Sequence, residues 1–198
     1  MAQPRPRRPR RGAPEDTRAR LIEAALAEFN AVGYHGTDSN RLARAAGYAP
    51  GTFYRHFPDK KAIFLAAYAA RVGRELAEID DRIVRAPTLP ALARAVVAFL
   101  VTHHRKWRGL RASLRSLAVT DPDARAFQLQ VRRGQLERIE QVRLSRGLSA
   151  RPREDHAVLL LVLERVADAI AEGEIAEMGL SERAATRALE RLVANELK

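Results

Sequence analysis

Hydrophobic side chains recur at intervals of three and four residues from Thr17 almost to the end of the chain. This period is typical of amphipathic helices, and no stretch alternates in the way that a half-buried strand does. In chain order, the first predicted helices cover 17–32, 39–46 and 50–56, and a long helix follows Pro58. Further helices begin near Leu89, near Trp107 and after Pro122, and the last two cover 154–171 and 181–197. The pattern predicts an all-α protein of about nine helices, with a loop over 146–153.

The helix predicted over 154–171 is unusual because Val158 to Leu163 is apolar on every face. A helix with one face in water normally carries polar residues on that face. Two explanations remain open. The helix lies in the centre of its own core, or it packs on its own domain on one side and on a second copy on the other. The helix predicted over 181–197 also has a broad apolar face, which favours a dimer interface.

The first 16 residues differ from the rest of the chain. Proline stands at four of these positions and arginine at five others. Proline lacks a backbone N–H and interrupts helices, and a stretch with so few apolar side chains has little to bury. We expect residues 1–16 to form a tail that is disordered in the free protein.

The net charge of the chain indicates a class of binding partner. The chain has a formal net charge of +11. The tail supplies five arginines, Glu15 and Asp16, which leaves +8 on the remainder. Such a balance favours a polyanionic partner, either nucleic acid or an anionic membrane surface, although a basic solvated surface is a further explanation.

Composition excludes several other classes. The absence of cysteine excludes a disulfide scaffold and thiolate chemistry, and a hydrophobic content of 46% excludes a disordered protein. The longest strongly apolar run is far shorter than the ~20 residues that span a membrane. No apolar segment follows the basic N-terminus as it would in a signal peptide. We expect a soluble cytoplasmic protein.

The segment from Gly36 to Phe57 carries the clearest local signals. Thr37 or Ser39 can cap the helix over 39–46, and Gly47 permits a left-handed residue where that helix ends. Pro50 suits the first position of the next helix. Two short helices around a tight turn form a helix-turn-helix, whose second helix enters the major groove of DNA.

The block from Thr17 to Tyr68 resembles the DNA-binding domain of the tetracycline-repressor (TetR) family. The resemblance rests on the Leu-Ala-x-x-Ala-Gly of the first short helix and on the run Gly-Thr-Phe-Tyr-Arg-His-Phe-x-x-Lys that ends at Lys60. Beyond the tail over 1–16, it implies a DNA-binding domain over 17–62 and a helical ligand-binding and dimerisation domain over 63–198. It also implies a homodimer through helices 154–171 and 181–197, and a repressor released from a palindromic operator by a small molecule.

The resemblance also implies roles for individual residues. By position in the motif, the expected phosphate contacts are Thr37, Ser39, Thr52, Tyr54 and Lys60. The residues expected at or near the bases are Arg41, Arg44, Gly51, Arg55 and His56. One departure is Ala49-Pro50, where many relatives have a polar residue before the Gly-Thr pair. This departure puts one phosphate contact in doubt.

A ligand cavity is expected among the middle helices. Its candidate wall residues lie on their inward stripes and are Tyr68, Phe99, His103, Trp107, Arg111, Phe127 and Val131. For each of them plain core packing is the competing explanation, and the sequence does not indicate which small molecule binds.

Other classes of function have less support from the sequence. The sequence shows no group of residues that would indicate an enzyme active site. His103 and His104 are adjacent, and they lack the spacing of four that places two metal ligands on one helix face. No metal and no cofactor is therefore expected. A membrane-surface protein would explain the tail but not the helix-turn-helix. A transcriptional activator, or a regulator without a ligand, fits the same fold and stays open.

Overall fold

The structure is a computed structural model that describes residues 14–197, where the regular elements are all helices. The predicted all-α class is confirmed. The ten helices of this range are α1 (Pro14–Val32), α2 (Ser39–Ala45), α3 (Pro50–Tyr54), α4 (Lys60–Arg85), α5 (Leu89–Lys106), α6 (Arg108–Thr120), α7 (Pro122–Ser145), α8 (Arg153–Glu172), α9 (Glu174–Glu177) and α10 (Glu182–Glu196). The helix beyond the expected number is the four-residue α9, which is too short for a periodic pattern.

The start of α1 corrects the sequence prediction. The helix begins at Pro14 rather than at Thr17, so the prediction that residues 14–16 belong to a disordered tail is wrong. Proline is tolerated at the first helical position because its missing N–H would have no partner there. Glu15 and Asp16 then lie in the first turn, where negative charge interacts favourably with the helix dipole. The remainder of the predicted tail, residues 1–13, lies outside the described residues.

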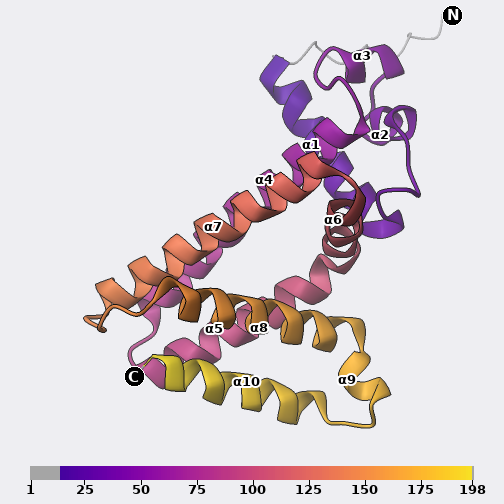
Figure 1. Cartoon of the computed structure of the whole chain (residues 1–198). Coiled ribbons are helices and arrows are strands. Elements are labelled where there is room, and N and C mark those ends of the chain that lie inside the picture. The colour runs from indigo at the N-terminus through magenta and orange to yellow at the C-terminus, as the bar shows by residue number, and fades with distance from the viewer. Residues whose placement is uncertain (1–13, 198) are drawn as a thin grey trace, which may run out of the picture.

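The helices form two packed groups that α6 connects. Helices α1, α2 and α3 pack with the start of α4 at one end of the molecule, and α5, α8 and α10 pack against one another at the other end (Figure 1). Helix α6 contacts α1 and also α8, so it reaches from the first group to the second. Helix α7 packs on α6 and α8 and also contacts α4.

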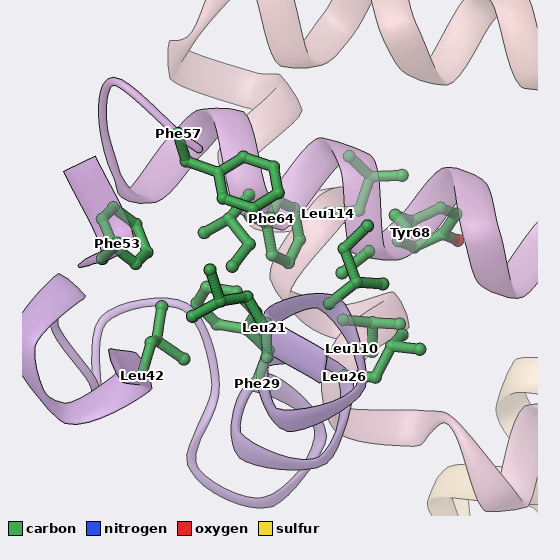
Figure 2. Close-up of a cluster of buried hydrophobic side chains, with 14 of the residues drawn as sticks. Leu21, Leu26, Phe29, Leu42, Phe53, Phe57, Phe64, Tyr68, Leu110 and Leu114 are labelled. Atoms are coloured by element: carbon green, nitrogen blue, oxygen red, sulfur yellow. The ribbon is translucent and has the colours of Figure 1, made fainter. Parts of the chain in front are cut away.

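The core of the first group is aromatic and includes part of α6. Phe29 of α1 meets Phe64 of α4 edge-to-face, with 5.0 Å between ring centroids. Leu110 and Leu114 of α6 are buried in the same cluster (Figure 2). The core beneath the helix-turn-helix therefore extends across the boundary expected at residue 62.

A second core lies between α5, α8 and α10. Its fully or nearly fully buried members include Leu92, Val97, Leu163, Ile170, Leu189 and Val193. This cluster uses only part of the apolar surface of α8 and α10. None of the helices between residues 14 and 197 has the length and apolar character to cross a membrane.

Helices α1 and α6 meet at a very close backbone approach. A Cβ atom added at Gly109 would lie 2.1 Å from the backbone oxygen of Asn30. The Asn30 side chain spans the break between α5 and α6: its Nδ2 donates to the Lys106 carbonyl at 2.8 Å, and its Oδ1 accepts from the Leu110 amide at 3.2 Å. Any residue larger than glycine at position 109 must push the two helices apart.

We therefore expect Gly109→Ala to destabilise the protein by about 1–3 kcal/mol, the usual cost of overpacking. Gly134→Ala is the matched control, because Gly134 lies in α7 and a Cβ there would meet nothing within 4 Å. Alanine is a better helix former than glycine, so the control is expected to be neutral or slightly stabilising. Urea unfolding of both variants measures the difference, and equal effects would contradict the close contact.

Candidate functional site

The turn between α2 and α3 has the geometry that the sequence predicts, with one correction. The N-cap of α2 is Asp38, whose Oδ1 accepts from the Arg41 amide at 2.8 Å, so the prediction of Thr37 or Ser39 as the cap is wrong. Asp38 has the extended backbone of an N-cap, whereas Ser39 is already helical. Gly47 has a φ of +80°, and Pro50 stands at the start of α3, as expected.

Helix α3 is amphipathic over a single turn. Phe53 is fully buried and Phe57, just beyond the helix, is 3% exposed. The opposite face presents Gly51, Tyr54 and Arg55, and Tyr54 is 57% exposed. Thr52 accepts a hydrogen bond from Nη2 of Arg55 at 3.3 Å. The aromatic core thus fixes α3 while its polar and cationic groups face outward.

Four further residues expected to contact DNA surround this face. Arg41 and Arg44 are exposed on α2, and Ser39 and His56 are half-buried. Arg41 forms an ion pair with Glu28 of α1. The structure therefore brings these side chains to the same end of the molecule as α3.

Lys60 and Thr37 have structural contacts of their own. The Lys60 Nζ donates to the carbonyl oxygens of Tyr34 at 2.9 Å and of Thr37 at 3.0 Å, and it lies 4.3 Å from the centroid of the Tyr34 ring. The Thr37 hydroxyl oxygen is buried and has no hydrogen-bond partner among the described residues. Lys60 ties the start of α4 to the loop before α2, and an ammonium group with three N–H donors keeps one for another partner.

A cavity of about 260 Å³ that is partly open to solvent lies between α4, α6, α7 and α8. Three of the predicted ligand-binding residues line it: Tyr68, Arg111 and Val131. A second cavity of about 140 Å³ is mainly apolar, and Phe99 lies in its wall. Gln135 of α7 borders both cavities.

The other three predicted ligand-binding residues line neither of these two cavities. His103 is buried and stacks on Phe99, with 3.9 Å between ring centroids. Trp107 is half-buried at the break between α5 and α6, and Phe127 packs against Tyr68. Trp107 and Phe127 both border the core of the first group of helices. The seven candidates therefore do not form one site.

Sequence analysis missed the charged wall of the larger cavity. The missed residues that line it include Arg71, Arg115, Arg132, Gln135, Glu164 and Asp168. A signal was present, because Arg71 and Glu75 continue the spacing of four that runs through Ile63 and Ala67 on the buried stripe of α4. Charged residues at buried stripe positions indicate an internal polar cluster.

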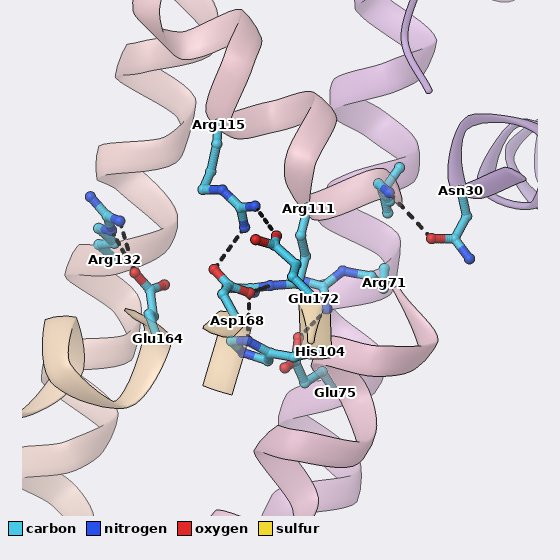
Figure 3. Close-up of polar contacts among 11 residues, drawn as sticks. Asn30, Arg71, Glu75, His104, Arg111, Arg115, Arg132, Glu164, Asp168 and Glu172 are labelled. Carbon is cyan, nitrogen blue, oxygen red and sulfur yellow. Dashed lines mark hydrogen bonds and ion pairs between the residues drawn. The ribbon is translucent and has the colours of Figure 1, made fainter. Parts of the chain in front are cut away.

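Asp168 of α8 is the centre of this cluster (Figure 3). Arg111 donates to it through Nε at 2.9 Å and Nη2 at 3.3 Å, and Arg115 donates through Nη1 at 2.7 Å. The Nδ1 of His104 lies 2.7 Å from Oδ1 of Asp168. Burial alone would raise the pKa of Asp168, but the contacts with His104 and Arg111 outweigh it and hold this pKa well below its usual range.

Helices α8 and α10 leave apolar side chains in solvent. Val158 is 61% exposed, Leu161 48% and Leu192 40%, whereas Leu160 and Leu189 on the same helices are buried. Helix α8 thus packs in its own core on one face and presents apolar side chains on another, so it is not a helix buried on all sides in the centre of its own core.

Comparison with known proteins adds independent findings. A model of the family described as "Bacterial regulatory proteins, tetR family" matches residues 21–67. The chain is 32% identical to the HTH-type transcriptional repressor AcnR of Corynebacterium efficiens over 177 residues, which are 85% of this chain and 89% of that protein. It is 30% identical to AcnR of Corynebacterium glutamicum over 176 residues, with the same coverage.

Solved structures share the fold. A putative TetR-family transcriptional regulator from Rhodococcus sp. superposes with a TM-score of 0.75 at 16% identity, covering 93% of this chain and 100% of that one. A putative transcriptional regulator from Saccharomonospora viridis, solved in complex with choline, superposes with a TM-score of 0.74 at 16% identity, covering 90% and 96%.

The environment of His104 predicts a dependence of stability on pH. His104 is 2% exposed, and burial lowers its pKa against the opposing pull of Asp168. In the unfolded chain a histidine takes up a proton near pH 6.5, whereas the buried ring stays neutral to lower pH. The unfolded state then binds more protons, so the free energy of unfolding must fall as the pH drops below about 6.5.

We expect His104→Asn to reduce this loss of stability between pH 7 and pH 5 by about 1 kcal/mol. The control is His35→Asn, because His35 is exposed. Urea unfolding at both pH values measures the change. A slope with pH in His104→Asn that equals the wild-type slope would show that His104 titrates normally in the native state.

Proposed function

Since this chain belongs to the TetR family and is a transcriptional regulator, we propose that it is a repressor that binds a palindromic operator as a homodimer and leaves it when a small molecule binds. It would act in the cytoplasm on double-stranded DNA. The observation that carries the proposal is the exposed face of α3, whose polar side chains project from a rigid aromatic core.

The proposed division of DNA contacts follows the positions of these residues in the family motif. Thr52 and Tyr54 of α3, together with Ser39 of α2, are proposed to position the protein on phosphates. Lys60 is proposed to add a phosphate contact through its remaining N–H, and Thr37 to hold Lys60 in place rather than touch DNA itself. The residues proposed at the bases are Arg41, Arg44, Gly51, Arg55 and His56. A Cβ at Gly51 would meet nothing within 4 Å, so the backbone there is open to close approach.

The proposed dimer forms through the exposed apolar face of α8 and α10. Val158 and Leu161 of α8 and Leu192 of α10 lie outside the chain's own core. A second copy would remove this surface from water through an isologous contact, which places two copies of α3 in a two-fold arrangement. Two-fold symmetry in the protein requires an inverted repeat in the DNA.

The ligand is proposed to occupy the cavity between α4, α6, α7 and α8. Helix α6 lines this cavity through Arg111 and Arg115 and contacts α1 through Gly109. A ligand changes the affinity for DNA only if it binds the two conformations of the protein with different affinities. A shift of α6 on ligand binding would move α1 and with it the helix-turn-helix.

Base readout is tested on a randomised pool of operator sequences. Arg55→Ala is expected to cost about 1–3 kcal/mol on the preferred operator and to relax the preference at one base pair, since arginine reads guanine in the major groove. Tyr54→Phe is the comparison variant and is expected to weaken binding to all sequences alike. Sequencing of the bound pool distinguishes the two. If both variants keep the wild-type preference, Arg55 does not read a base.

Dimerisation is tested with a charge on the proposed interface. Val158→Glu is expected to give a monomer at micromolar concentration that no longer binds the palindrome, because burying an unpaired carboxylate costs several kcal/mol. Val84→Glu is the control, since Val84 is 79% exposed and belongs to α4, not to the proposed face of α8 and α10. Sedimentation gives the mass, and circular dichroism verifies that both variants stay helical. A folded wild-type monomer would contradict the proposal.

A further inference from the structure

The larger cavity has an unusually basic wall. Five arginines line it, namely Arg71, Arg111, Arg115, Arg132 and Arg165, against two acidic residues, Glu164 and Asp168. The remaining acidic partners of these arginines, Glu75, Glu172 and Glu174, do not line the cavity. The cavity wall therefore carries more cationic than anionic side chains, and charge interactions there are screened less than in bulk water.

Two side chains that line the cavity carry a buried polar atom without a hydrogen-bond partner. Arg71 is 3% exposed, and its Nη1 lies 2.6 Å from Oε2 of Glu75. The Nε of Arg71 has no hydrogen-bond partner among the described residues, and the same holds for Oε1 of Gln135. A buried polar atom without a hydrogen bond costs about 1–3 kcal/mol. Both side chains line the cavity, where a polar ligand would relieve that cost.

Asp168 is the carboxylate that now occupies the cationic end of the cavity. It accepts hydrogen bonds from Arg111 and Arg115, both of α6, while Arg132 of α7 is bound by Glu164 at 2.8 Å (Figure 3). A guanidinium has five N–H donors, and each of these contacts uses one or two. The remaining donors can bind a second carboxylate or a phosphate in the fork geometry that arginine favours.

We propose that this cavity binds a compact organic anion with at least two acidic groups, which are carboxylates or phosphate esters. One acidic group binds Arg71 beside Gln135, and the other competes with Asp168 for Arg111 and Arg115. Binding of the anion needs no DNA, so this part of the assignment is independent of the proposed function. Only the release of the operator by the anion rests on the proposed function.

Size and polarity decide against a long apolar ligand in this cavity. Its volume of about 260 Å³ lies just below the usual range of small-molecule sites, about 300–1,000 Å³. The apolar cavity beyond Gln135 adds about 140 Å³. Five guanidinium groups disfavour the binding of an alkyl chain, because their N–H donors would lose hydrogen bonds to water and gain none from the chain.

The competition with Asp168 has a consequence for α6. Arg111 and Arg115 now link α6 to α8 through Asp168. An anion that takes over these donors weakens that link, and α6 carries Gly109 and Ser113, which contact Asn30 and Tyr34 of the first helix group. The ligand thereby acts on the contact that positions the helix-turn-helix.

The test is calorimetric titration of the full-length protein without DNA. The probes are the dicarboxylates malonate, succinate, glutarate and adipate, the phosphate ester 3-phosphoglycerate, which also carries a carboxylate, the monocarboxylate butyrate, the neutral succinamide, and octanoate. We expect at least one dicarboxylate or the phosphate ester to bind at least tenfold more tightly than butyrate and succinamide. The two acidic classes then identify which anion the site prefers. Equal binding of succinamide, or binding of octanoate alone, would overturn the proposal.

Variants locate the site. Arg71→Gln and Arg132→Gln are each expected to weaken binding of the preferred anion about tenfold or more. Arg133→Gln is the matched control, because Arg133 is the exposed neighbour of Arg132 and does not line the cavity. Asp168→Asn is expected to tighten binding several-fold, since it removes the competing carboxylate. If Arg133→Gln loses as much affinity as Arg71→Gln, the anion binds by overall charge and the assignment is wrong.

Operator release is measured separately by fluorescence anisotropy of labelled DNA. If the anion binds and Arg71→Gln abolishes that binding while the DNA is never bound or never released, the cavity assignment stands and the proposed repressor function fails. If DNA binds but no acidic probe does, the cavity assignment fails and the DNA-binding function stands.

Discussion

The contact between α1 and α6 is the constraint on which the rest of the structure depends. Gly109 allows the α6 backbone to touch the end of α1, and Asn30 completes the hydrogen bonds that the break between α5 and α6 would leave open. The Ser113 hydroxyl accepts from the Tyr34 amide at 2.9 Å and extends the contact by one turn. Because Leu110 and Leu114 belong to the aromatic core, α6 cannot move without moving the helices that present α3.

The opposite face of α6 carries the charges of the cavity. Burying charged groups is costly, and an ion pair in the interior often stabilises a fold less than apolar packing would. Stability alone is therefore a weak explanation of the network around Asp168. Asp168 supplies a carboxylate to Arg111 and Arg115 in the free protein, and an anionic ligand would offer a competing one. One short helix thus joins a cationic cavity to the DNA-binding end of the chain.

The sequence predicts well those features that depend on neighbours in the chain. Gly47 and Pro50 specify the turn between α2 and α3 through backbone conformation alone, and the spacing of apolar residues by three and four gives most helix bounds within a few residues. Composition misplaces the start of α1, because the proline-rich character of the tail obscures how well Pro14 suits a first helical position. Asp38 was overlooked as a cap because Thr37 and Ser39 on either side of it are also capping residues.

The cavity could not be predicted in the same way because its geometry comes from four helices far apart in sequence. Phe99 and His103 lie on an inward stripe, as expected, but they stack on each other away from the larger cavity. Arg71 lies on the stripe of α4 and was passed over because a charged residue there looks like an interruption. Arg71 becomes part of a cavity wall only because the fold brings Arg111 of α6 and Asp168 of α8 to the same cavity.

The link from α3 through α1 to α6 is tested most directly by the emission of Trp107, the only tryptophan of the chain, which stands at the break that Asn30 spans. Titration with operator DNA is predicted to change this emission with the same midpoint as the anisotropy of the labelled DNA. Asn30→Ala, which removes the side-chain link, is predicted to bind DNA with a much smaller change in emission. Operator binding that leaves the emission of wild-type Trp107 unchanged would contradict the link between the DNA-binding end and the cavity.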